Sequence, residues 1–167
     1  MKILKTLSLF IIFAISLNAS NNAFVKAGQA YKINPKLLWA IAYKESRFNA
    51  LAINKANKNK TYDIGIMQIN SSHLKWLKRD YGISEKDLFT KPKINIYVGA
   101  LILRKCFDKH GANINGITCY NGRIKDNPYG KDVLVILEKQ EKKILKQRIA
   151  KTLLTRNEKD FVRVLNK

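Results

Sequence analysis

Acidic residues are scarce in this chain of 167 residues. Twelve Asp and Glu stand against 32 Lys and Arg, which gives a formal net charge of +20 at pH 7. Such an excess indicates an anionic partner without identifying its chemical class. Only Lys2 and Lys5 are charged among the first twenty residues, so nearly all of the excess belongs to the remainder of the chain.

Repeats, low-complexity linkers and clear strand patterns are also lacking. The length is enough for one compact domain with an appended helix but too short for two full domains. A hydrophobic content of 46% is ordinary for a globular protein, so a core of normal size is expected.

The chain has only two cysteines, Cys106 and Cys119. In an oxidising compartment they would pair in a disulfide, and the alternative is two buried free thiols. Neither His73 nor His110 has carboxylates or cysteines at a spacing typical of metal ligands. No metal site is therefore predicted.

The N-terminus has the layout of a secretory signal peptide. Lys2 and Lys5 precede an apolar run from Leu7 to Leu17, and cleavage is expected after Ala19. The alternative is a retained membrane anchor, but the run is short for a span of about 20 residues. Residues 1–19 therefore predict export to the periplasm, where lipid headgroups, cell-wall polymers and acidic proteins are the available anions and nucleic acid is not an expected partner.

The apolar spacing predicts a mainly α-helical fold. Asn34 is expected to cap a helix that begins at Pro35, and Gly111 is expected to end another. The expected helices are Ala23 to Tyr31, Pro35 to Phe48, a helix capped by Ser71 or Ser72 through Lys78, Ile94 to Lys109, and Asn113 to Tyr120.

Strand signals are weak. Residues 64–69 alternate apolar with other residues, and the polar stretch 49–62 has room for a small β-hairpin. After residue 132 the chain becomes Lys-rich with an apolar stripe, which predicts a basic amphipathic helix over 133–167 appended to a domain over 20–132. This helix is expected to pack on the domain; a membrane surface or a partner protein are the alternatives.

Glu45 is the candidate catalytic residue. Helical spacing places it on the same face as three apolar residues, Leu38, Ile41 and Ala42. A carboxyl on such a face is desolvated, which raises its pKa and suits it to act as a general acid near neutral pH. The alternative is a Glu at the edge of the face that pairs with Arg47 or Arg123.

Three segments in order carry a family resemblance: YKESRFN from Tyr43 to Asn49, DIGIMQIN from Asp63 to Asn70, and CYNGR from Cys119 to Arg123. They resemble the three motifs of the SLT-type (family 1) lytic transglycosylases of the lysozyme-like superfamily. The likeness covers residues 23–130 and is greatest to the small specialised enzymes of type III and type IV secretion systems. It implies a goose-type, lysozyme-like helical domain.

The resemblance also implies roles for particular residues. Glu45 matches the catalytic acid/base, and Tyr120 matches a tyrosine that contacts the catalytic carboxyl. Residues that would orient substrate or line the cleft are Ser46, Gly65, Met67, Gln68, Asn70 and Asn121. Without the resemblance, the alternative for Met67 is a core residue and the alternative for Tyr120 is a buried aromatic residue. A Cys106–Cys119 disulfide would brace the helix that carries Tyr120.

The implied reaction cleaves the bond between N-acetylmuramic acid and N-acetylglucosamine with closure of a 1,6-anhydro ring, and it needs no metal or cofactor. The expected partners are peptidoglycan glycan strands, with secretion-system subunits reached through 133–167, and a monomer is expected. Asp63 is the candidate for the second carboxylate of a hydrolytic, lysozyme-type enzyme. A non-catalytic wall-binding protein is the third reading.

Overall fold

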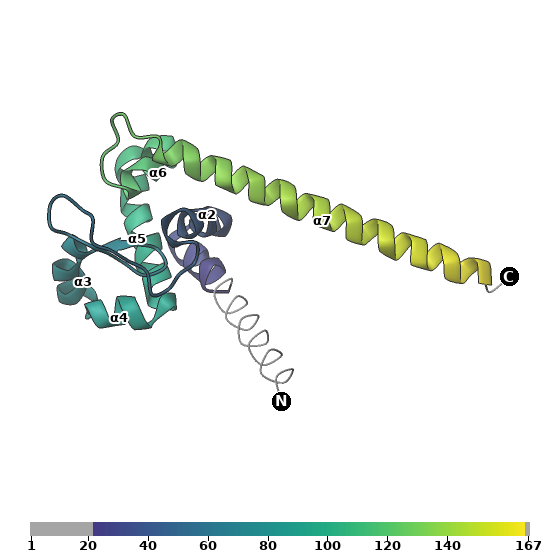
Figure 1. Ribbon diagram of the computed structural model, residues 1–167, viewed down its shortest axis with the longest axis horizontal. Coiled ribbons are helices and arrows are strands. Elements are labelled where there is room, and N and C mark those ends of the chain that lie inside the picture. The colour runs from purple at the N-terminus through teal and green to yellow at the C-terminus, as the bar shows by residue number, and fades with distance from the viewer. Residues whose placement is uncertain (1–21, 166–167) are drawn as a thin grey trace.

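The computed structural model describes residues 22–165, and it describes side chains for residues 22–156. The predicted signal peptide lies outside these residues. The described chain forms a small, mainly helical domain from which one long helix, α7, projects (Figure 1). No helix of the described chain is both long and apolar enough to cross a membrane.

The first helices begin where the sequence predicted. Residues 22–31 are helical, and α2 spans Pro35–Ser46. The Asn34 side chain accepts a hydrogen bond from the Lys36 backbone N–H at 2.9 Å, which caps α2. Pro35 occupies the first turn, where its missing N–H has no helical partner to lose. Arg47 then ends α2 in a left-handed conformation with a φ of 52°.

A three-stranded antiparallel sheet follows, made of β1 (Ile53–Asn54), β2 (Asp63–Ile64) and β3 (Ile69–Asn70) in that order. The stretch 64–69, whose alternation was a weak strand signal, is a hairpin with a tight turn. Gly65 and Gln68 both have a positive φ, and the Gln68 N–H donates to the Gly65 carbonyl at 3.0 Å. The glycine allows this turn, which the alternation pattern concealed.

The next helices are α3 (Leu74–Tyr81) and α4 (Glu85–Thr90), with a 3-10 turn, η1 (Ser71–His73), before α3. The predicted cap at Ser71 or Ser72 is wrong, because Asn70 caps η1 by accepting from the Ser72 N–H. The Ser71 hydroxyl instead accepts a hydrogen bond from the Tyr62 N–H at 3.1 Å, which connects η1 to the sheet. Helix α4, missed in the sequence, begins with a capping box.

Helices α5 (Pro92–His110) and α6 (Ile114–Tyr120) pack against each other. Both lie close to the ranges that the sequence predicted. Asn113 caps α6 by accepting from two backbone N–H groups, and Gly111 ends α5 with a φ of +81°. Cys106 on α5 and Cys119 on α6 form a disulfide, with their Cα atoms 5.7 Å apart. The prediction that these cysteines pair is therefore confirmed.

Removing this disulfide should destabilise the domain by about 3 kcal/mol, because a short loop would no longer be closed in the unfolded chain. Cys106→Ser with Cys119→Ser is the variant to compare with the oxidised protein by chemical denaturation. The oxidised and reduced forms of the wild-type protein provide the control, since they should differ by a similar amount. Equal unfolding free energies in all three samples would contradict the expectation.

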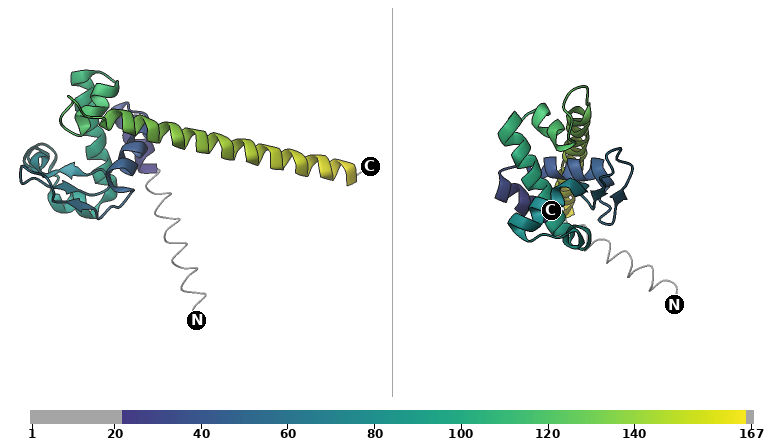
Figure 2. Two further views of the ribbon diagram at one scale, coloured as in Figure 1. Left: turned by 45° about the horizontal axis from the view of Figure 1, so that its top comes forward. Right: turned by 90° about the vertical axis from the view of Figure 1, so that its left-hand side faces the viewer.

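Helix α7 (Tyr129–Leu165) begins inside the domain and ends far outside it (Figures 1 and 2). Tyr129 and Val133 are buried, and two ion pairs, Lys44–Asp132 at 2.9 Å and Lys36–Glu141 at 3.0 Å, tie α7 to α2. At 1.5 Å per residue the 37-residue helix is about 55 Å long.

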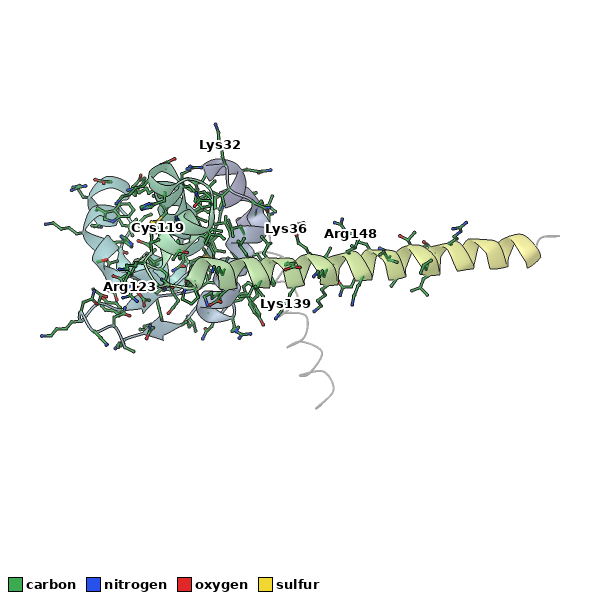
Figure 3. All side chains as sticks on the ribbon, turned by 90° about the horizontal axis from the view of Figure 1, so that it is seen from above. Lys32, Lys36, Cys119, Arg123, Lys139 and Arg148 are labelled. Carbon is green, nitrogen blue, oxygen red and sulfur yellow. A yellow bond between two sulfur atoms is a disulfide. The ribbon has the colours of Figure 1, made fainter. Side chains whose placement is uncertain are left out.

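The distal part of α7 does not pack on the domain, contrary to the favoured expectation for residues 133–167. Leu145, Ile149, Leu153 and Leu154 are each more than half exposed. Figure 3 places Lys139 near the domain and Arg148 on the projecting length of the helix. The break in composition at residue 133 marks the fifth residue of a continuous helix, one turn after its start.

Candidate active site

A cleft of about 990 Å³ lies in the domain between the sheet and the α5–α6 pair. Its wall on the sheet side is polar and rich in Asn, and its opposite wall carries the disulfide and several basic side chains. The residues that line it include Glu45, Lys58, Asp63, Gln68, Asn70, His73, Trp76, Ile102, Lys105, Cys106, Lys109, Tyr120, Asn121 and Arg123.

Glu45 reaches the cleft from the last turn of α2. The three residues that share its face, Leu38, Ile41 and Ala42, have no exposed surface, as their spacing predicted. Burial of the carboxyl raises the pKa of Glu45 from 4.5 to about 7, and the negative charge of Asp63 adds to this rise. The charge of Lys44 acts in the opposite direction.

No Lys or Arg forms an ion pair with Glu45 among the side chains that the structure describes. Arg47, one proposed partner, instead donates to the Tyr43 hydroxyl and lies over its ring. Trp39 and Phe48 form an aromatic cluster with Tyr43 outside the cleft lining. Glu45 can therefore carry and exchange a proton without a permanent cationic partner.

The hydroxyl of Tyr129 donates a hydrogen bond to Oε1 of Glu45. Because this bond favours the ionised carboxylate, it lowers the pKa of Glu45 and partly offsets the effect of burial. Tyr129 is 84 positions from Glu45, and no local pattern links them. The only local signal is Pro128, which marks the start of a helix but does not indicate the direction of the Tyr129 side chain.

Tyr120, rather than Tyr129, was expected to contact the catalytic carboxyl. The structure gives the Tyr120 hydroxyl a different partner, the backbone carbonyl of Met67, at 2.8 Å. The rings of Tyr120 and Tyr129 stack with centroids 6.5 Å apart. Tyr120 thus supports the tyrosine that bonds to Glu45 and holds the hairpin turn against α6.

Met67 and Gly65 are buried behind the cleft wall and not on its surface, so the expectation that they line the cleft is wrong. Met67 has no exposed surface and packs against Gly99, where a Cβ would lie 2.8 Å from the Met67 Cε. A Cβ on Gly65 would lie 2.3 Å from the side-chain nitrogen of Asn95. The close approach that requires glycine at position 65 is therefore made by a protein side chain.

Asn95 is a buried polar residue that sequence reasoning missed. Its Oδ1 accepts from the Met67 N–H at 2.9 Å, and its Nδ2 donates to the carbonyls of Ile64 and Leu88 at 2.8 and 3.0 Å. One side chain on α5 thereby fixes both sides of the turn that borders the cleft. Its position in the first turn of α5, between the apolar residues Ile94 and Ile96, was the available signal.

Side chains of Ser46, on α2, and of Gln68, within the turn, also hold this turn in place. The Ser46 hydroxyl donates to the Ile66 carbonyl at 2.8 Å, so it joins the end of α2 to the hairpin. The amide of Gln68 donates to the carbonyls of Gly65 and Ala52 while the residue also lines the cleft. Asn121 lines the cleft too, where its side chain accepts from Asn127 at 3.0 Å.

Asp63 stands on the sheet side of the cleft. Its carboxylate accepts hydrogen bonds from three amide groups, those of Asn54, Asn57 and Asn70, at 3.2, 3.0 and 2.6 Å. The cleft thus contains two carboxyls in different surroundings, one buried beside a tyrosine and one held by amides. Within the described residues no three His, Cys, Asp or Glu side chains gather into a group that would hold a metal ion.

Residues 22–127 match the family described as the transglycosylase SLT domain. X polypeptide of Escherichia coli is 39% identical over 117 residues, which cover 69% of this chain and 67% of that protein. Invasion protein IagB of Salmonella typhimurium (strain SL1344) is 37% identical over 114 residues, covering 68% and 70%. Protein IpgF of Shigella sonnei is 42% identical over 96 residues, covering 58% and 62%.

A solved structure of an inactive mutant of the lytic transglycosylase Slt from Pseudomonas aeruginosa has a similar fold. The TM-score is 0.58 over 74% of this chain and 24% of that chain, at 19% sequence identity. The expected fold class is therefore confirmed: a mainly helical, lysozyme-like domain with a small antiparallel sheet and a long C-terminal helix.

Proposed function

The chain belongs to the transglycosylase SLT domain family, and on that premise we propose that it is a peptidoglycan lytic transglycosylase with Glu45 as its acid and base. The observation that carries the proposal is a buried carboxyl in the cleft whose pKa, about 7, allows both protonation states near neutral pH. The cleft volume of about 990 Å³ is sufficient for several sugar units of a glycan strand.

In the proposed reaction the Glu45 carboxyl gives its proton to the glycosidic oxygen between N-acetylmuramic acid and N-acetylglucosamine. The bond from that oxygen to the muramoyl C1 breaks, and the substrate's own N-acetyl group stabilises the cation-like carbon. The Glu45 carboxylate then accepts the proton of the muramoyl 6-hydroxyl, and the oxygen of that hydroxyl forms a bond to C1. The products are a new N-acetylglucosamine end and a 1,6-anhydro ring, with Glu45 protonated again.

The rate should fall as the pH rises through about 7, because the first step requires protonated Glu45. Tyr129→Phe should move this alkaline limb to higher pH, since the hydroxyl that favours the ionised carboxylate is lost. The measurement is the pH profile of fragment release from peptidoglycan. Tyr31→Phe, outside the cleft lining, is the matched control and should leave the limb in place. An unshifted limb in Tyr129→Phe would contradict the assignment.

The alternative reaction is hydrolysis by a lysozyme-type pair of carboxyls. It is favoured by one observation: Asp63 lines the same cleft and its charge acts on Glu45. Mass spectrometry of the released muropeptides separates the two reactions, because anhydro products are lighter by one water. We expect anhydro ends; reducing ends alone would replace the transglycosylase by a hydrolase, with Asp63 as the carboxylate that activates water.

We further propose that the chain is exported to the periplasm and opens the wall locally for a secretion apparatus. The signal-peptide pattern of residues 1–19 supports export, and the name of the Salmonella relative, an invasion protein, supports the second part. The projecting length of α7, which carries basic and apolar side chains away from the domain, is the proposed contact for subunits of that apparatus.

A further inference from the structure

The two walls of the cleft differ in charge. Four basic side chains line it, Lys58, Lys105, Lys109 and Arg123, against two carboxyls. Three of the four lie on the α5–α6 side, and none of the four forms an ion pair with any side chain that the structure describes. Their neighbour Arg104, which is outside the cleft lining, does pair, with Asp108. The α5–α6 wall thus presents cationic groups without anionic partners.

The positions of these groups are set by the fold. Ile102, Lys105, Cys106 and Lys109 follow the spacing of one helix face, so α5 turns that whole face toward the cleft. The disulfide joins this face to α6, and Arg123 follows the end of α6 on the domain itself (Figure 3). The Asn127 side chain donates to the Arg123 carbonyl at 2.7 Å, which holds the loop that carries the guanidinium.

The three cations are not equivalent. The Lys105 ammonium lies 3.9 Å from the centre of the Trp76 ring, so it already has a cation–π partner. Lys109 and Arg123 are both exposed and have no such partner among the described aromatic rings. A guanidinium and an ammonium on one wall are suited to bind carboxylates, the guanidinium through two parallel hydrogen bonds.

Intact peptidoglycan offers carboxylates in one place. The sugars of its glycan strand are uncharged, because the lactyl acid of each muramic residue is bound in an amide, and the free carboxylates lie on the peptide substituents. We propose that Lys109 and Arg123 bind these peptide carboxylates, so that the protein selects glycan that carries acidic peptides. The inference rests on the proposed function, which supplies the glycan strand, but it concerns a separate contact.

The test compares native peptidoglycan with the same material after its carboxyl groups have been converted to amides. The measured quantity is the ratio of the two rates of fragment release. Wild-type protein should prefer native peptidoglycan, and Lys109→Gln with Arg123→Gln should lower the ratio by about tenfold, which corresponds to about 1.4 kcal/mol. The matched control, Lys86→Gln with Lys93→Gln, removes the same charge from exposed positions outside the cleft lining and should keep the wild-type ratio.

The outcomes are distinguishable. If wild-type protein releases no fragments from either material, the proposed function fails. If it releases fragments from both at equal rates, the function stands and the peptide contact is overturned. An equal fall in ratio for both double variants would indicate a general effect of net charge and would also overturn the contact. The contact would also be overturned if Lys109→Gln with Arg123→Gln lost the same fraction of the rate on both materials while its thermal unfolding was unchanged.

Discussion

Glu45→Gln is expected to slow the release of peptidoglycan fragments by about a hundredfold to ten-thousandfold, the usual contribution of a positioned general acid. The amide has nearly the shape of the carboxyl and can still accept the hydrogen bond from Tyr129, but it cannot supply a proton to the glycosidic oxygen. The measurement is the initial rate on purified peptidoglycan at pH 6, where the wild-type carboxyl is mostly protonated.

The control for this variant is Glu138→Gln, which changes an exposed Glu on α7 that pairs with Lys142. It should leave the rate unchanged. Full activity of Glu45→Gln would remove Glu45 from the reaction. If neither the wild-type protein nor Glu45→Gln released fragments but both bound the wall, the domain would be a wall-binding adaptor and not an enzyme.

The same variant has an expected effect on stability. The pKa of Glu45 is about 7 in the folded protein against an ordinary value of 4.5, so the folded state holds this proton more tightly than the unfolded chain does. The resulting stabilisation is complete below pH 4.5 and is lost as the pH rises through 7. A shift of this size corresponds to about 3 kcal/mol. Relative to wild type, Glu45→Gln should therefore gain about that much unfolding free energy between pH 4 and pH 9.

Asn95→Ala is expected to lower the free energy of unfolding by about 3 kcal/mol or more. It removes the partners of one buried N–H and two buried carbonyls, those of Met67, Ile64 and Leu88. Each buried polar group left without a partner costs about 1–3 kcal/mol. Chemical denaturation gives the free energy of unfolding, and Asn115→Ala, at an exposed position on α6, is the control.

The hairpin turn gives this variant a second readout. Because Asn95 fixes the turn between β2 and β3, its loss should also lower the rate of fragment release at temperatures where the protein remains folded. Asn95→Asp provides a graded comparison, since it keeps the acceptor for the Met67 N–H but loses both donors to the carbonyls. Wild-type stability in Asn95→Ala would show that the turn has other sufficient supports.

Local signals predicted much of the helical framework. Asn34 before Pro35 and Gly111 after Lys109 and His110 mark helix ends because capping and backbone geometry depend on neighbouring residues. The apolar face of α2 likewise placed Glu45 in a desolvated position from helical spacing alone. These predictions needed no knowledge of any contact distant in the sequence.

The parts that failed depend on such distant contacts. Tyr129 meets Glu45 across 84 positions, and Asn95 meets Met67 across 28. Helical or strand spacing cannot indicate which of several tyrosines or asparagines will make these bonds. Met67 was misplaced for the same reason: its segment borders the cleft, but packing against Gly99 directs its side chain into the core.

Helix α7 has a consequence for any shortened form of the protein. Tyr129, its first residue, donates to Glu45, yet most of the helix lies beyond the domain. A single helical turn is costly to nucleate and gains its stability as further residues propagate the helix. The projecting residues therefore help to keep the first turn formed, and cutting the chain after residue 132 would leave Tyr129 in a turn prone to fray. The length of α7 thus influences the fraction of time for which the Glu45 carboxyl receives the hydrogen bond from Tyr129.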